Sequence, residues 1–249
     1  MLRGILDGRR VADMRFIEGI DQEYDPALLD RVREENNKRA FAKARQERIK
    51  VSVAQWLNSV HSEHACLSFD TPGFIDKIRS VLTPVGREEL NNYLEKPTKF
   101  LVLHGDTGLA KTSLAVALGT HLIQQGVVES ADLVLGSTML DSFSQYNPFS
   151  RDGQINPVKH YSEVDFLVMD DIGVGNEKIT ATQEQRLSAV IDNRWGEGKP
   201  TIITTNMAIN TGHDGLGLDK YFTRSTWNRI IDDSHFIHFS GESFRARED

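Results

Sequence analysis

The sequence contains very little cysteine and no apolar run of membrane-spanning length. Its 249 residues include one cysteine, Cys66, which excludes an internal disulfide and a cysteine-rich zinc site. No run of about 18 apolar residues occurs, so we expect no transmembrane helix and no membrane partner. The opening residues MLRGILDGRR lack an apolar stretch with a cleavage site, so we expect no secretory signal. From these absences we expect the protein to reside in a reducing cytoplasm.

The chain also lacks the basic excess of proteins that coat nucleic acid. Its net charge is −7, which argues against non-specific coating of DNA or RNA. Up to Pro97 there are 16 basic and 16 acidic residues, and after it 13 and 20. Residues 31–50 hold eight basic and three acidic residues. This segment predicts either a solvated helix face or a contact surface for nucleic acid or an acidic partner.

The first part of the chain is predicted to be helical. Asp25 is a plausible N-cap and Pro26 suits the first helical position,. The next residues run to 50 without glycine or proline, and the helical pattern continues through 53–62, 72–82 and 84–95. KPTK at 96–99 then breaks the pattern,. We therefore expect a small helical domain over residues 1–97 and a second domain over 98–249.

After residue 98 short apolar segments alternate with helical ones. Strands are predicted at 100–105, 131–137, 165–171, 200–206 and 235–241,. Helices are predicted between them, such as 111–126, which Gly126 stops,. This alternation is typical of an α/β fold, in which a parallel sheet is covered by helices on both faces. Ligands of such sheets bind beyond the carboxyl ends of the strands.

One strand-to-helix turn resembles a phosphate-binding loop. GDTGLAKT at 105–112 follows the pattern G-x-x-x-x-G-K-[ST] except at Ala110, and it sits between a predicted strand and a predicted helix. Backbone N–H groups and the helix N-terminus would bind phosphate. Lys111 would bridge the β- and γ-phosphates, and Thr112 would bind Mg²⁺. The predicted ATP-binding residues are Gly105, Asp106, Thr107, Gly108, Leu109, Ala110, Lys111, Thr112 and Ser113.

Ala110 stands where the motif has glycine. The loop needs a small residue there, and alanine adds a single Cβ. We expect the substitution to be tolerated, with a negative φ at this position.

Polar residues follow two of the other predicted strands. FLVMDD ends in two carboxylates, of which Asp170 suits a Mg²⁺ site and Asp171 suits the general base that activates water. Many ATPases of this kind have glutamate at the second position, so the shorter Asp171 predicts slow hydrolysis. TIITTN ends in Asn206, whose amide could hold the attacking water.

The order of these motifs resembles a known family. DDIG (170–173), RWGEGKPTIITTN (194–206) and GESFR (241–245) are similar to the DnaC and DnaI helicase loaders of the AAA+ superfamily and the related transposition ATPase IstB. The resemblance covers residues 98–245. It implies that Asn206 is sensor 1, that Arg245 is sensor 2, and that Arg229, or as second choice Arg224, is an arginine finger acting on a neighbouring subunit. With alanine at position 110, GDTGLAKT is similar to the phosphate-binding loops of the MCM helicases and the MoxR ATPases.

The resemblance implies an Mg²⁺-dependent ATPase that loads a hexameric replicative helicase onto single-stranded DNA in the cytoplasm of a bacterial cell, encoded by the host or by a phage. Residues 1–97 would bind the helicase, and the chain would self-associate through its arginine finger. The zinc-binding cysteines of DnaI are absent. Two alternatives stay open. One is an IstB-like ATPase that assembles on duplex DNA. The other is an adaptor protein that uses ATP binding as a switch and hydrolyses little ATP.

Residues 142–161 interleave aromatic and basic side chains, which suits stacking on bases and contact with phosphates. The candidates are Tyr146, Phe149, Arg151, Lys159 and Tyr161. Local packing of the same aromatic residues is the alternative.

Overall fold

The computed structural model describes residues 26–60, 64, 67–97, 100–149, 153–173, 179–209 and 217–244. The predicted N-cap Asp25, the basic residue Arg151 and the predicted sensor Arg245 lie outside these ranges. Contacts divide the chain into one unit over 1–46 and a second over 47–249. Each unit is described by itself below.

The second unit is built on a five-stranded parallel sheet. Its strands are β1 (Phe100–Gly105), β2 (Ala131–Leu135), β3 (Phe166–Asp170), β4 (Thr201–Thr205) and β5 (Ser234–Phe239). They lie in the order β2-β3-β4-β1-β5. All five predicted strands are confirmed to within one or two residues at each end. Because the strands are parallel, their carboxyl ends share one edge, which places the predicted site residues there.

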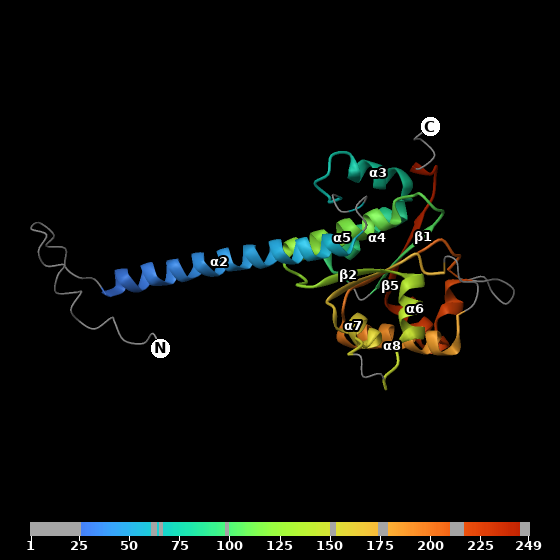
Figure 1. Ribbon diagram of the computed structural model, residues 1–249. Coiled ribbons are helices and arrows are strands. Elements are labelled where there is room, and N and C mark those ends of the chain that lie inside the picture. Colours follow the sequence, from blue (N-terminus) through green and yellow to red (C-terminus); the bar gives the residue numbers. More distant parts are fainter. Residues whose placement is uncertain are drawn as a thin grey trace, which may run out of the picture. The chain divides into compact units, whose positions relative to one another are not determined.

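Helices cover both faces of the sheet (Figure 1). They are α5 (Lys111–Gln125), α6 (Gly136–Gln145), α7 (Pro157–Glu163), α8 (Ala181–Glu197) and α9 (Arg224–Asp233), with a short 3-10 turn, η2 (Leu218–Tyr221). Successive residues of β1 alternate between two cores: Leu101 and Leu103 pack with α5, while Phe100 and Val102 pack with α6, α8 and α9. A strand that is buried on both sides is apolar throughout, which explains why these segments lack polar alternation.

In the described residues before the first strand lie the helices α2 (Pro26–Ser59), α3 (Phe74–Val81) and α4 (Pro84–Glu95). The last turns of α2 belong to the core of the second unit. Trp56 is fully buried there, its ring meets Phe166 edge-on at 5.9 Å, and its Nε1 donates to Thr120 Oγ1 at 3.2 Å. The division between the two units thus falls within α2, whereas the sequence places a domain boundary at residues 97 and 98.

The part of α2 that precedes residue 47 has exposed side chains wherever they are described. Its ion pairs are local, such as Glu34–Lys38 at 2.7 Å and Glu35–Arg39 at 2.6 Å. Exposed pairs of this kind contribute little to stability. Phe41 is 77% exposed. The basic segment is therefore a solvated helix in this structure, and a role in contacting a partner stays a prediction.

A buried arginine of α8 joins the amino ends of β3 and β4. Arg194 is fully buried and donates to the carbonyl oxygens of Tyr161, Val164, Asp165 and Pro200 and to the Thr201 hydroxyl. Burial lowers the pKa of its guanidinium to about 10. The arginine of RWGEGKPTIITTN thus has a structural role at the edge opposite the candidate site.

Within the described ranges, no helix is both long and apolar enough to cross a bilayer. The same ranges hold no cluster of three or more histidine, cysteine or acidic residues arranged around a metal position.

Candidate nucleotide site

The turn after β1 has the backbone of a phosphate-binding loop. Gly105 has a φ of +134° and Gly108 a φ of +76°, a region that side chains with a Cβ rarely adopt. A Cβ on Gly105 would also lie 2.1 Å from the carbonyl oxygen of Phe239 on β5. Glycine at 105 therefore lets the loop start directly against the last strand. The loop leads straight into the N-terminus of α5.

Ala110 caps that helix in a left-handed conformation, with φ +64° and ψ +28°. The expectation of a negative φ at this position is wrong. The reason is geometric, because the residue before Lys111 must turn the chain into α5, and the loop does so in the region that glycine usually fills. A left-handed conformation costs an L-residue about 1–2 kcal/mol. The structure accommodates alanine here with backbone strain.

Lys111 is buried and joins the loop to the end of β4. Its Nζ donates to the carbonyl oxygens of Gly105 and Asp106, at 2.8 and 2.7 Å, and to Asn206 Oδ1 at 2.7 Å. Lys111 and Asn206, which are 95 positions apart in the sequence, are therefore in direct contact. The loop thus contacts the polar end of β4 directly.

Thr112 and Asp170 form the second contact across the sheet edge. The Thr112 hydroxyl lies 2.9 and 3.1 Å from the two carboxylate oxygens of Asp170, and the Thr204 hydroxyl donates to Asp170 Oδ1 at 2.6 Å. Burial raises the pKa of Asp170, and the neighbouring Asp171 raises it further, while the hydrogen bonds from Thr204 and Thr112 oppose the rise. A hydroxyl beside a carboxylate offers the hard oxygen donors that Mg²⁺ prefers, so this pair fits the ion.

Asp171 begins the turn after β3 with a φ of +52°. Its backbone N–H donates to Thr204 Oγ1 at 2.8 Å, and the residue lines the same cavity as Lys111 and Asn206. Thr204 therefore holds both aspartates, one through its hydroxyl hydrogen and the other through its oxygen. The turn brings Asp171 out of the buried strand and toward the loop.

The cavity that these residues line has a volume of about 330 Å³, which is in the range of small-molecule sites. A second cavity of about 220 Å³ shares part of its wall, and all of its lining residues except Lys77 are uncharged. Four lining residues were not predicted from the sequence: His64, Leu67, Lys77 and Phe244. His64 Nδ1 lies 3.4 Å from Ser113 Oγ. No motif marks the first three, while Phe244 belongs to the quoted GESFR.

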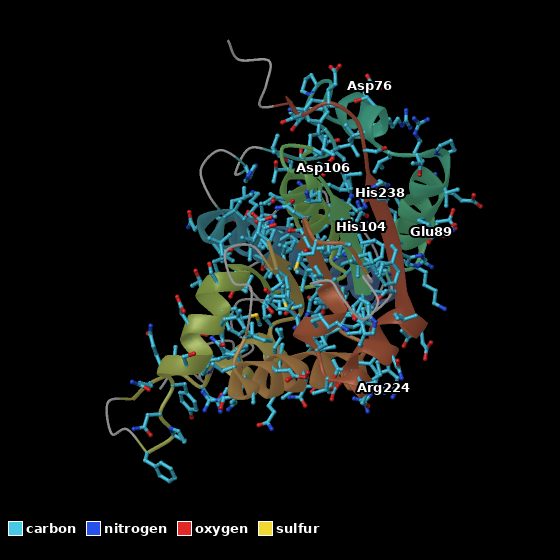
Figure 2. The ribbon with its side chains drawn as sticks, turned by 90° about the vertical axis from the view of Figure 1, so that its right-hand side faces the viewer. Asp76, Glu89, His104, Asp106, Arg224 and His238 are labelled. Carbon is cyan, nitrogen blue, oxygen red and sulfur yellow. The ribbon has the colours of Figure 1, made fainter. Side chains whose placement is uncertain are left out.

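The two described arginine candidates do not line this cavity. Arg229 lies 2.5 Å from the Asp192 carboxylate and over the ring of Trp195, 5.3 Å from its centroid. Arg224 is exposed at the start of α9. In Figure 2 it lies near the bottom of the view, well below Asp106. Neither arginine therefore lines the candidate nucleotide cavity of its own chain in this conformation.

Some described residues of the segment predicted to contact DNA pack against the protein. Tyr161 lies on α7, is buried, and meets Phe143 edge-on at 6.2 Å. Of the two alternatives for this residue, DNA contact and local packing, the structure has local packing, because its ring belongs to the core under α6. Phe149 is 90% exposed. Tyr146 stacks under Arg186 at 5.5 Å, and Lys159 is exposed beside Glu163 at 3.7 Å. Phe149, Tyr146 and Lys159 stay candidates.

Two histidines face each other beside the loop. His104 on β1 and His238 on β5 are partners in the sheet register, with stacked rings 4.9 Å apart (Figure 2). Burial, together with the nearby His238 and Lys111, lowers the pKa of His104 to about 4. His104 is therefore neutral at neutral pH.

Comparison with known proteins gives a family match and similar folds. The family model described as IstB-like ATP binding protein matches residues 91–249, and no curated protein matches the sequence. The fold is similar to a DnaC helicase loader, with a TM-score of 0.52 and 17% identity over 72% of this chain and all of that one. It is also similar to AMPPCP-bound DnaA from Aquifex aeolicus, with a TM-score of 0.50 and 15% identity over 72% of this chain and 54% of that one.

Proposed function

Because the chain belongs to the family of IstB-like ATP-binding proteins and is an ATPase of the AAA+ fold, we propose that it uses ATP to load a hexameric replicative helicase onto single-stranded DNA. One observation carries the ATP-dependent part of this proposal. The loop lysine and the loop threonine each contact the polar end of a different strand, through Lys111–Asn206 and Thr112–Asp170. Binding and hydrolysis residues therefore share one sheet edge.

The chemistry follows from these positions. Lys111 and the loop N–H groups hold the β- and γ-phosphates. Thr112 and Asp170 would hold Mg²⁺, which neutralises charge on the phosphates when bound. Asn206 orients the attacking water, and the Asp171 carboxylate accepts its proton. Since aspartate is one methylene shorter than glutamate, the water must lie closer to the turn, and we expect slow turnover.

A neighbouring copy of the chain would complete the site. Arginine stabilises the charge that develops on a transferring phosphoryl group. Arg229 would first have to leave Asp192 and Trp195. Arg224 has an exposed side chain with no hydrogen bond or ion pair to any residue in the described ranges. Accessibility thus favours Arg224 over Arg229 as the trans-acting residue, which reverses the order that the resemblance implies. Arg245 remains the proposed sensor 2.

The partner contacts belong to other parts of the chain. The order of the motifs supports a helicase as the partner, because it resembles that of the DnaC and DnaI loaders. We assign helicase binding to the helical residues up to 97. The exposed ring of Phe149, with Tyr146 and Lys159 in the same segment, suits single-stranded DNA, on whose bases aromatic rings can stack,.

The loader role is tested by capture of a replicative helicase. The tagged full-length chain should retain a purified hexameric helicase in an ATP-dependent manner and should transfer it to single-stranded DNA. No retention with or without ATP contradicts the loader role.

The family match also favours the second candidate, an IstB-like ATPase on duplex DNA. ATP-dependent binding to duplex DNA, with filament formation and without helicase retention, would select that function instead.

A further inference from the structure

Lys77 stands at the junction of the two cavities. Four residues line both the cavity of the phosphate-binding loop and its smaller neighbour: Leu67, Lys77, Ala110 and Ser113. Lys77 is the one charged residue among these four. It comes from α3, which is separated in sequence from every predicted site residue.

The two cavities differ in chemistry. The larger holds Lys111, Thr112, Asp171 and Asn206 and therefore suits the phosphates. The smaller is lined by Leu67, Thr71, Pro72, Gly73 and Phe74, which offer apolar surface and backbone groups. Such a wall suits a flat base and a sugar. A cation between the two cavities lies where the phosphate chain of a nucleotide meets its ribose.

The surroundings of Lys77 leave its ammonium group able to bind an anion. Its Nζ lies 4.4 Å from the centroid of the Phe244 ring, a cation–π contact that leaves N–H donors unused. Within the described residues, no carboxylate lies within ion-pair distance of Lys77. Phe244 is itself fixed to the loop, since its backbone N–H donates to the carbonyl oxygen of Gly108 at 3.0 Å.

The backbone that carries Lys77 is held firmly against the sheet. Phe74, Ile78 and Val81 bury the inner face of α3. Ser240 N–H donates to the Val81 carbonyl oxygen at 3.0 Å, and the residue after α3 forms a bridge with Phe239 at the end of β5 (Figure 1). The backbone of Lys77 is therefore held in place relative to the loop, while its four-carbon side chain can change conformation.

We propose that Lys77 is a second cationic ligand of the nucleotide, which binds the phosphate nearest the ribose from α3. The proposal rests on the assignment of the loop as the ATP site. Because that phosphate is present in ATP and in ADP and does not react, Lys77 stabilises the ground state and the transition state equally. Such a contact lowers KM and leaves kcat unchanged. A charge-assisted hydrogen bond to phosphate corresponds to about 10- to 100-fold in affinity.

The test compares nucleotide affinities of four full-length proteins: the unsubstituted chain, Lys77→Met, Lys77→Arg and the control Lys96→Met. Lys77 and Lys96 are both exposed, so neither substitution opens the core. Dissociation constants for ATP and ADP are measured by titration calorimetry, with kcat and KM in parallel. We expect Lys77→Met to lower the affinity for both ATP and ADP at least tenfold, with kcat within twofold of the unsubstituted chain. Lys77→Arg should retain most of the affinity, and Lys96→Met should change neither affinity nor kcat.

Equal affinities of Lys77→Met and the unsubstituted chain would overturn the proposal, and so would a loss confined to ATP or a fall in kcat at unchanged affinity. If the unsubstituted chain binds neither nucleotide, the proposed ATP site itself fails. The two failures are therefore distinguishable in one set of titrations.

Discussion

The two ends of the candidate site are built in different ways. The phosphate end consists of the tips of three adjacent strands and the start of one helix, joined by short hydrogen bonds such as Lys111–Asn206 and Thr112–Asp170. The other end consists of α3, the segment before it and Phe244 near the chain end, which meet through packing and backbone contacts. The residues proposed for hydrolysis lie at the phosphate end. The other end supplies the wall of the smaller cavity and one cationic side chain, Lys77.

This comparison predicts that substitutions at the phosphate end change turnover most. Asp171→Asn keeps the shape of the side chain and removes the proton acceptor, so turnover should fall at least about 100-fold while ATP affinity stays within a fewfold. Steady-state hydrolysis and ATP titration measure the two effects. Asp141→Asn, on the exposed face of α6, is the matched control. Unchanged turnover in Asp171→Asn would remove the assigned base.

The joint between the loop and β5 should be sensitive to a single methyl group. In Gly105→Ala the Cβ would meet the Phe239 carbonyl oxygen at 2.1 Å with φ at +134°, so we expect a loss of roughly 3 kcal/mol or more in the free energy of unfolding. Gly198→Ala has open space around it and a φ of +66°, and should cost about 1 kcal/mol. Urea unfolding compares them. Equal losses of unfolding free energy in the two variants would show that the close approach of Gly105 to β5 does not affect stability.

A smaller effect is expected at the strained alanine. Ala110→Gly removes a Cβ from the left-handed region, and the gain exceeds the entropy added to the unfolded chain, so stability should rise by roughly 0.5–1 kcal/mol. Ala115→Gly, within α5 and buried, should lower stability by about 1 kcal/mol. Thermal unfolding of both variants is the measurement. A loss of stability in Ala110→Gly would contradict the strain at this position.

The mildest prediction concerns pH. The pKa of His104 is lowered to about 4 in the folded chain, against about 6.5 when unfolded. As pH falls from 6.5 toward 4 the unfolded state takes up the proton first, so this residue favours unfolding progressively over that range. Urea midpoints at pH 7 and pH 5 should differ less in His104→Asn than in the unsubstituted chain. An identical difference in both would show that His104 does not titrate as described.

The sequence predicts the phosphate end well because its signals are local. The strands are short apolar runs, and the loop, FLVMDD and TIITTN are contiguous motifs whose meeting follows from parallel strand direction. The other end depends on where α3 packs, and no short-range pattern links Lys77 to Gly108 or Phe244. The sequence predicts the wrong sign for the φ of Ala110 and leaves the packing of Tyr161 open, for a related reason. Both are set by neighbours, the turn into α5 in one case and the core under α6 in the other.

The assignment of GDTGLAKT as the ATP site is tested most directly by ATP binding to Lys111→Ala. Lys111 has its ammonium at the centre of the phosphate end, and its removal takes away the main cation of the loop. Calorimetric titration of the folded variant should show ATP affinity reduced at least about 100-fold, since a charge-assisted contact to phosphate is lost in a buried site. ATP affinity equal to that of the unsubstituted chain would contradict the account.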